Sequence, residues 1–163
     1  MIHPPTGRTL RHSLFAAGIA AGAVFTVLGP AAAGECPPDK RGTDLTKMNA
    51  TPAKGVSDTV LAAINLAEEP AKLQGRQLRL RKLVIQPGGV VPWHSHGDRP
   101  AIIYIIEGDI LEYASTCAVP IVHKAGEVAR ETHATSHWWK NAGDKTVVLL
   151  SADILHDESD KNM

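Results

Sequence analysis

The chain has 163 residues, and its 17 lysines and arginines are balanced by 17 aspartates and glutamates. This even balance gives no sign of nucleic acid or an anionic membrane surface as a partner. With only two cysteines and no C-x-x-C pair, the composition also argues against thiol redox catalysis.

The first 33 residues predict a secretory signal peptide. Arg8 and Arg11 give a positive start without acidic residues, and an apolar run follows at residues 14–28. Ala31-Ala32-Ala33 then offers a small-residue cleavage site before Gly34. We therefore expect export to the periplasm or outside the cell, with no stable membrane insertion after cleavage.

An uncleaved membrane anchor is the alternative, because residues 14–33 are about long enough to span a bilayer. The glycines and the proline within this run favour cleavage instead. Cleavage after Ala33 would leave residues 34–163, which carry 15 basic and 17 acidic side chains once Arg8 and Arg11 are removed. These 130 residues are enough for one domain with a real core but not for two.

Residues 34–57 predict an N-terminal arm with little structure of its own, since they are rich in Pro, Lys, Asp, Thr and Gly. A folded domain would then occupy residues 58–163. Cys36 in the arm and Cys117 in the domain form an even pair in an exported chain, which permits one disulfide between them. The alternative is a buried Cys117 and an unrelated Cys36.

From residue 58 onward the chain predicts short strands separated by Gly and Pro turns. Residues 58–67 fit either a short helix or a strand, and residues 77–86 read as a strand with a bulge. Pro87-Gly88-Gly89 signals a turn. Further strands are expected at 101–106, 110–115, 121–124, 127–131, 136–140 and 146–152, with a solvated tail after residue 155. This spacing predicts an all-β sandwich or barrel.

Two histidines have the spacing of metal ligands in residues 88–108, which read GGVVPWHSHGDRPAIIYIIEG. Because side chains alternate along a strand, His94 and His96 should point to the same face and share one ion. Two histidines on a polar surface turn are the alternative. A second segment, residues 126–141 with the sequence GEVARETHATSHWWKN, supplies His137 in a matching frame and favours the metal site.

These two segments resemble the two sequence motifs of the cupin superfamily. In the first motif, G-x5-H-x-H-x(3,4)-E-x6-G, the residues in register are Gly88, His94, His96 and Gly108. In the second, G-x5-P-x-G-x2-H-x3-N, they are Gly126, His137 and Asn141. The resemblance covers roughly residues 78–151. It implies a double-stranded β-helix, the jelly-roll barrel of cupins, and it favours a strand at residues 58–67.

The departures from the family pattern define the expected ligand set. Ala101 stands where the usual glutamate ligand is expected, and Pro100 occupies the alternative position. Thr132 and Ala134 replace the Pro and Gly of the second motif. The resemblance therefore implies three histidine ligands, which are His94, His96 and His137. Asp98 and His133 are weaker candidates for a further ligand or for a residue that supports the ligands, and each could equally be a surface polar residue.

Residues that share strand parity with a ligand should line the pocket of the barrel. These residues are Ala101, Ile103, Ile105 and Trp139, although Trp139 is equally compatible with ordinary core packing. Arg99 or Arg130 could contact an acidic substrate, but parity places neither of them securely inside.

Three neutral imidazoles suit a divalent transition metal, with Fe(II) expected and Zn, Mn, Ni or Cu as alternatives. A three-histidine face leaves coordination positions open, as catalytic sites do. Cupins without the glutamate ligand include iron-dependent dioxygenases, so the resemblance implies an Fe(II)-dependent dioxygenase that acts on a small organic substrate. The alternatives are a non-enzymatic cupin that binds a metal or small ligand, and a Zn- or Mn-dependent isomerase or hydrolase. The resemblance also favours a homodimer.

Overall fold

The computed structural model describes Met1, residues 34–44 and residues 52–156. The predicted signal peptide after Met1 and the last residues of the tail therefore lie outside the described residues. The elements are η1 (Pro38–Lys40), β1 (Lys54–Asn65), β2 (Gln77–Ser95), β3 (Ala101–Glu107), β4 (Asp109–Ala114), β5 (Ile121–Lys124), β6 (Val128–Glu131), β7 (Ser136–Lys140) and β8 (Val147–Leu155). This order confirms the all-β class. Over the same ranges, no helix is long and apolar enough to cross a bilayer.

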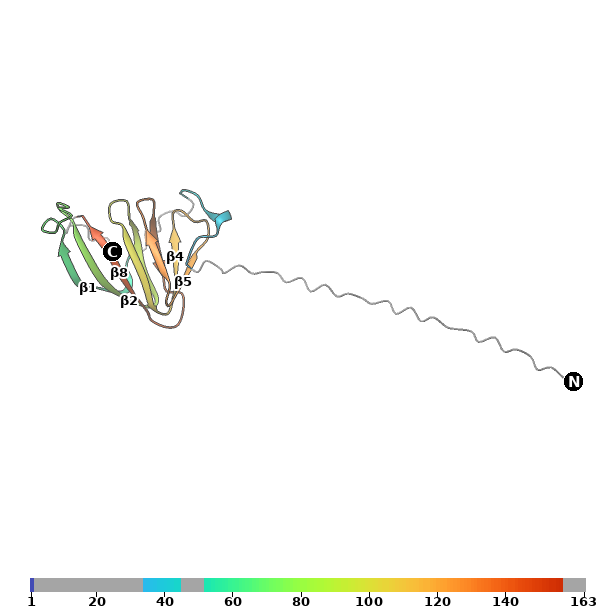
Figure 1. Ribbon diagram of the computed structural model, residues 1–163. Helices are drawn as coiled ribbons and strands as arrows, with labels where there is room; N and C mark the ends of the chain where they lie inside the picture. Colours follow the sequence, from blue (N-terminus) through green and yellow to red (C-terminus); the bar gives the residue numbers. More distant parts are fainter. Residues whose placement is uncertain (2–33, 45–51, 157–163) are drawn as a thin grey trace.

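The strands form one antiparallel sheet in the order β5-β4-β7-β2-β8-β3-β6, and β1 pairs with β2 outside this path. Figure 1 shows the sheet curling into a barrel, with β1 near one end and β4 and β5 near the other. β2 organises the barrel because it pairs with β8 over residues 77–85 and with β7 over residues 90–95. The predicted homodimer stays a prediction, since the structure contains a single chain.

The turn predicted at Pro87-Gly88-Gly89 is wrong, because β2 continues through these residues. Gly88 has a φ of 72°, which glycine adopts without the steric cost of a side chain. Its amide donates to Asn141 O at 2.9 Å, and the Asn141 amide donates to Gly89 O at 3.0 Å. Pro and Gly residues, which often form a turn at the end of a strand, therefore form a bend within a continuous strand here. The register of β2 with β1 shifts at the same place, between Lys54 and Val56.

The region that fitted either a helix or a strand is β1, which begins at Lys54, four residues before the domain boundary predicted at residue 58. Apart from Val56, its residues are exposed. β1 therefore contributes backbone pairing to β2 and little to the core.

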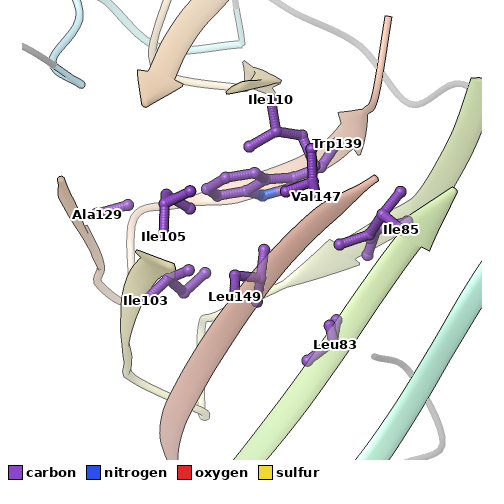
Figure 2. Close-up of a cluster of buried hydrophobic side chains, with 10 residues drawn as sticks. Leu83, Ile85, Ile103, Ile105, Ile110, Ala129, Trp139, Val147 and Leu149 are labelled. Carbon is purple, nitrogen blue, oxygen red and sulfur yellow. The ribbon is translucent and has the colours of Figure 1, made fainter. Parts of the chain in front are cut away.

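The hydrophobic core lies inside the barrel. Buried residues alternate with exposed residues along most of β3 and with partly buried residues along β8, so one face of each strand points inward. Figure 2 shows side chains from several strands gathered around the indole of Trp139. The cluster consists of Leu83, Ile85, Val91, Ile103, Ile105, Ile110, Ala129, Trp139, Val147 and Leu149. This packing fixes the strands that carry the histidines.

The segment of residues 34–44 is tied to the barrel beside β4 and β5 (Figure 1). A disulfide joins Cys36 to Cys117 across a sequence separation of 81 residues. The Ala118 amide donates to Lys40 O at 3.0 Å, and the Gly42 amide donates to Thr116 O at 3.1 Å. The only regular structure in this segment is the three-residue η1. The predicted arm thus has little secondary structure here but a defined position.

Replacing Cys36 and Cys117 with serine should destabilise the protein by about 2–4 kcal/mol, because a cross-link over a long loop restricts the unfolded chain. Guanidinium unfolding of the oxidised wild type and of the double variant would measure this. The reduced wild type is the matched control and should unfold with the double variant. An unchanged midpoint in both would contradict the stabilising role of the disulfide.

Candidate metal centre

Three buried histidines converge at one point inside the barrel. His94 lies near the end of β2 and His96 directly follows that strand, whereas His137 lies on β7 as the direct cross-strand partner of His94. Their Nε2 atoms are separated by 3.1 Å (His94 and His96), 3.0 Å (His96 and His137) and 3.1 Å (His94 and His137). Nitrogens bound at 2.0–2.1 Å to one ion lie about 3 Å apart. The donor set and its spacing therefore fit a single divalent transition metal.

The other nitrogen of each imidazole is held by an acceptor. His94 Nδ1 donates to Pro92 O at 2.9 Å, and His96 Nδ1 donates to Arg99 O at 2.7 Å. His137 Nδ1 donates to Glu112 Oε1 at 2.7 Å. A proton on Nδ1 leaves the lone pair on Nε2, where a metal would bind. All three rings are thus oriented as ligands by their neighbours.

Glu112 is a residue of the site that the sequence analysis missed. It lies on β4, is 4% exposed, and accepts hydrogen bonds from both His137 Nδ1 and His123 Nε2, each at 2.7 Å. The available signal was its strand parity, because Glu112 lies on the same face of β4 as the buried Ile110 and Ala114. A charged residue at a core position of a strand indicates a polar partner inside the barrel.

Glu131 brings a second carboxylate to the same histidine. It lies on β6 directly opposite Ala101, the position of the missing glutamate, and its Oε2 is 3.5 Å from His137 Nδ1. Glu112, Glu131 and His137 are close enough to hold an ion themselves. Such an ion would use His137 Nδ1, the nitrogen that donates to Glu112, whereas the three-histidine cluster uses Nε2.

The ionisation of the ligands follows from their surroundings. Burial, followed by the charge of His137, lowers the pKa of His94 well below its usual 6.5 and lowers the pKa of His96 to about 4. Burial acts to lower the pKa of His137 too, but the charge of Glu131 and the hydrogen bond and charge of Glu112 outweigh it and raise that pKa. Metal therefore meets two unprotonated imidazoles and competes with a proton at His137.

The two carboxylates have opposite pKa shifts. Burial alone would raise the pKa of Glu112, but the hydrogen bonds from His123 and His137 and their charges lower it to about 2. Burial raises the pKa of Glu131 to about 7, and the charge of Glu112 adds to this increase. Glu112 is consequently the fixed negative charge beside His137.

A buried cluster of arginines around Asp153 adjoins the histidines. Asp153 accepts from Arg79 at 2.7 and 3.0 Å, lies 3.2 Å from Arg81, and is 3.8 Å from Arg99 Nε. Arg99 is 2% exposed, and its charge is a further cause, after burial, of lower pKa values at the ligands. Arg130 is exposed. Of the two arginines considered from the sequence, the structure places Arg99 inside.

A small cavity of about 20 Å³ lies beside His94 and His96. Of the predicted lining residues, Ile103 and Trp139 line it, whereas Ile105 is in the core and Ala101 lies at a groove elsewhere on the barrel. Trp139 therefore serves both as core and as cavity wall. The complete lining is Arg81, Leu83, Val91, His94, His96, Ile103, Trp139, Leu149 and Ser151. The cavity is apolar along most of its wall and polar at Arg81, Ser151 and the two histidines.

Asp98 and His133 do not reach the centre. Asp98 is exposed and pairs with Arg76 at 2.6 Å and with His156 Nδ1 at 2.7 Å. The hydrogen bond from Arg76 lowers the pKa of Asp98. His133 is exposed in the loop before β7. Neither residue belongs to a group of described side chains that could hold a metal ion.

The fold and the site together define a jelly-roll barrel protein with a buried three-histidine cluster suited to a metal. Residues 81–153 match the family model described as a cupin domain. The match covers the region in which the two sequence motifs resemble those of the cupin superfamily. A search of curated proteins found no match.

Several solved structures are similar to this chain. A cupin-2 domain from Rhodospirillum rubrum has a TM-score of 0.52 at 15% identity, covering 69% of this chain and 68% of that one. The cupin domain of Cnp3 from Schizosaccharomyces pombe has a TM-score of 0.48 at 16% identity, covering 66% of each chain. Oxalate oxidase in complex with the substrate analogue glycolate has a TM-score of 0.48 at 21% identity. That match covers 71% of this chain but 62% of the oxalate oxidase chain.

Proposed function

We propose that the protein is an exported cupin metalloenzyme that binds one divalent metal, with Fe(II) as the leading candidate, through His94, His96 and His137. The enzyme would use molecular oxygen to oxidise a small organic substrate. The observation that carries this proposal is the convergence of three Nε2 atoms at 3.0–3.1 Å, each on a ring whose Nδ1 is already bonded. Three protein ligands leave positions for substrate and oxygen, and bound iron would supply the activation of oxygen.

The chain's own residues would orient the substrate and exclude water. Leu83, Val91 and Leu149 form the apolar wall beside the histidines. Arg81 is buried at the polar end of the cavity, where its guanidinium donates to Ser151 Oγ at 3.3 Å. The charge of Arg81 is already compensated by Asp58 and Asp153. Its Nε has no hydrogen-bond partner among the described residues, so we expect a substrate with a polar group that can accept from it.

A second candidate function is metal and small-ligand binding without a reaction. The cavity of about 20 Å³ favours metal binding without a reaction, because this space suits about one water molecule and any organic substrate or ligand would require side chains to move. The Zn- or Mn-dependent isomerase or hydrolase remains a third proposal, which differs from the first in the metal and in its independence from oxygen.

Metal analysis combined with oxygen uptake separates these functions. We expect the exported protein, purified without added metal or a histidine tag, to contain about one iron per chain. It should then consume oxygen with at least one substrate from a panel of thiols, diketones and phenols. Iron at this level without oxygen uptake would favour the binding protein, and zinc or manganese would favour the isomerase or hydrolase. Folded protein that binds none of these metals would contradict all three.

A further inference from the structure

His123 is a buried histidine with one nitrogen still available. It lies on β5 with no exposed surface, and its Nε2 donates to Glu112 Oε2 at 2.7 Å. His123 Nδ1 has no hydrogen-bond partner within the residues that the structure describes. When Nε2 carries the proton, Nδ1 is an acceptor, and a buried acceptor without a donor is unfavourable. A hydrogen-bond donor at Nδ1 is therefore expected in the functional protein.

Gly34 lies against this nitrogen. It has a φ of 75°, and Cys36, two residues later, is held by the disulfide to Cys117. A substituent in the Cβ position of Gly34 would lie 2.8 Å from His123 Nδ1 and 3.2 Å from Glu127 Oε2. A carbon atom at 2.8 Å would be in steric conflict. A nitrogen that donates hydrogen bonds would be at an ordinary distance from both atoms.

The free amino group of Gly34 can reach this position. In the intact chain its nitrogen is held in the peptide bond to Ala33. Hydrolysis of that bond by a signal peptidase adds one water molecule, leaving a carboxylate on Ala33 and an ammonium on Gly34. A rotation of about 120° around the Cα–C bond then moves the nitrogen into the Cβ position, because N–Cα and Cα–Cβ bonds are nearly equal in length and the positions are staggered. The Gly34 carbonyl and the rest of the chain need not move.

We propose that residues 1–33 are removed and that the new α-ammonium of Gly34 binds between His123 Nδ1 and Glu127 Oε2. The ammonium supplies the missing donor to His123 and pairs with a carboxylate. It completes a chain of hydrogen bonds that runs from the processed end through His123 and Glu112 to His137. Removal of the leader would thus finish the structure that supports one of the metal ligands. In the backbone conformation of the intact chain, a side chain at position 34 would fill this space.

The cleavage is tested first, with the full 163-residue chain expressed for export. The exported protein is purified, and its first residue is determined by intact mass and N-terminal peptide sequencing. We expect Gly34 to be the first residue. Export with any other first residue would overturn the proposal, because the α-ammonium would then lie away from His123. Neither result depends on metal content or oxygen uptake, so failure here is separate from failure of the proposed function.

Binding of the ammonium is tested by its reactivity in the exported protein. Acylation of the Gly34 α-amine with an acetyl ester is followed by mass spectrometry of the N-terminal peptide, relative to the rate in guanidinium. We expect Glu127→Gln to raise the relative rate roughly tenfold, the size expected for one charge-assisted hydrogen bond. The glutamine keeps one side-chain oxygen, which can still accept the hydrogen bond that the Lys124 amide donates to Glu127 Oε2 at 2.9 Å.

Glu35→Gln is the matched control, because Glu35 is the next residue to Gly34 but its carboxylate pairs with Arg41 at 3.1 Å. This variant should acylate at the wild-type rate. Equal rates in the wild type and in Glu127→Gln would overturn the proposed binding, and so would a native wild-type amine that reacts as fast as in guanidinium. A ¹⁵N spectrum gives a second readout, since N-terminal acetylation should shift the His123 Nδ1 resonance but leave that of His156 unchanged.

Discussion

The His94→Gln variant should retain almost none of the metal that the wild type binds at about one ion per chain, with an affinity at least about 100-fold lower. A roughly 100-fold loss of metal affinity is the upper end of the range for changing a residue that is hydrogen-bonded to a ligand. The loss should be at least as large here, because a ligand itself is removed. Glutamine has no imidazole nitrogen to place at the point where the three Nε2 atoms converge. Elemental analysis and competition with a chelator would measure the loss, and His96→Gln and His137→Gln should behave alike.

His94 is the best ligand for this test because its Nδ1 donates only to a backbone carbonyl, that of Pro92. Removing His137 would also deprive the buried Glu112 carboxylate of a hydrogen-bond donor. His156→Gln is the matched control, since this histidine is exposed and pairs with Asp98 away from the centre. The same metal content in the His94 and His156 variants would refute the ligand assignment. His123→Gln is unsuitable as a control because His123 is bonded to Glu112.

The three histidines could be predicted from the sequence because their placement depends on two local rules. A period of two puts His94 and His96 on one face, and the family spacing puts His137 on a strand that returns beside them. The structure brings them together through the pairing of His94 with His137. The short strands between Gly and Pro residues could also be predicted from the sequence, because each strand depends on a few neighbouring residues.

The residues behind the ligands could not be assigned in this way. Glu112 and His123 are 11 residues apart and meet only because β4 and β5 pair with Ile110 opposite His123 and Glu112 opposite Ile121. Sequence alone does not fix that register. Arg99 lies in the loop between β2 and β3, where strand parity does not apply, so its burial was not foreseeable. The turn predicted at Pro87-Gly88-Gly89 was wrong because turns and bulges favour the same residue types.

Glu112→Gln should weaken metal binding by about 10- to 100-fold, the range observed when a residue that holds a metal-binding histidine is changed. The side chain keeps its volume, so the barrel need not repack. Its single carbonyl oxygen can replace only one of the two carboxylate oxygens, which accept from His123 and His137. The variant also removes the negative charge that makes His137 a stronger donor of electrons to a metal.

The matched control for this variant is Glu131→Gln, which changes a second buried carboxylate near the same ring. Its oxygen lies 3.5 Å from His137 Nδ1, beyond the 2.7 Å of the Glu112 hydrogen bond. We expect a clearly smaller loss of affinity in this variant, as measured by chelator competition. Equal losses in the two variants would mean that total charge, and not the orientation of His137, controls the site. Wild-type affinity in Glu112→Gln would exclude Glu112 as a positioning residue.

Acid unfolding of the metal-free protein gives an independent readout of the same residue. The pKa of Glu112 is lowered to about 2 from its usual value of 4.5. A lowered pKa in the folded state means that the ionised carboxylate stabilises the fold above pH about 4.5, and that this contribution disappears as the pH falls toward 2. Glu112→Gln should therefore be less stable than the wild type at pH 6 and lose less stability between pH 4.5 and pH 2. Parallel curves for the two proteins would show that Glu112 is not ionised against its two histidines, and the negative charge assigned to it beside the metal ligand would have to be withdrawn.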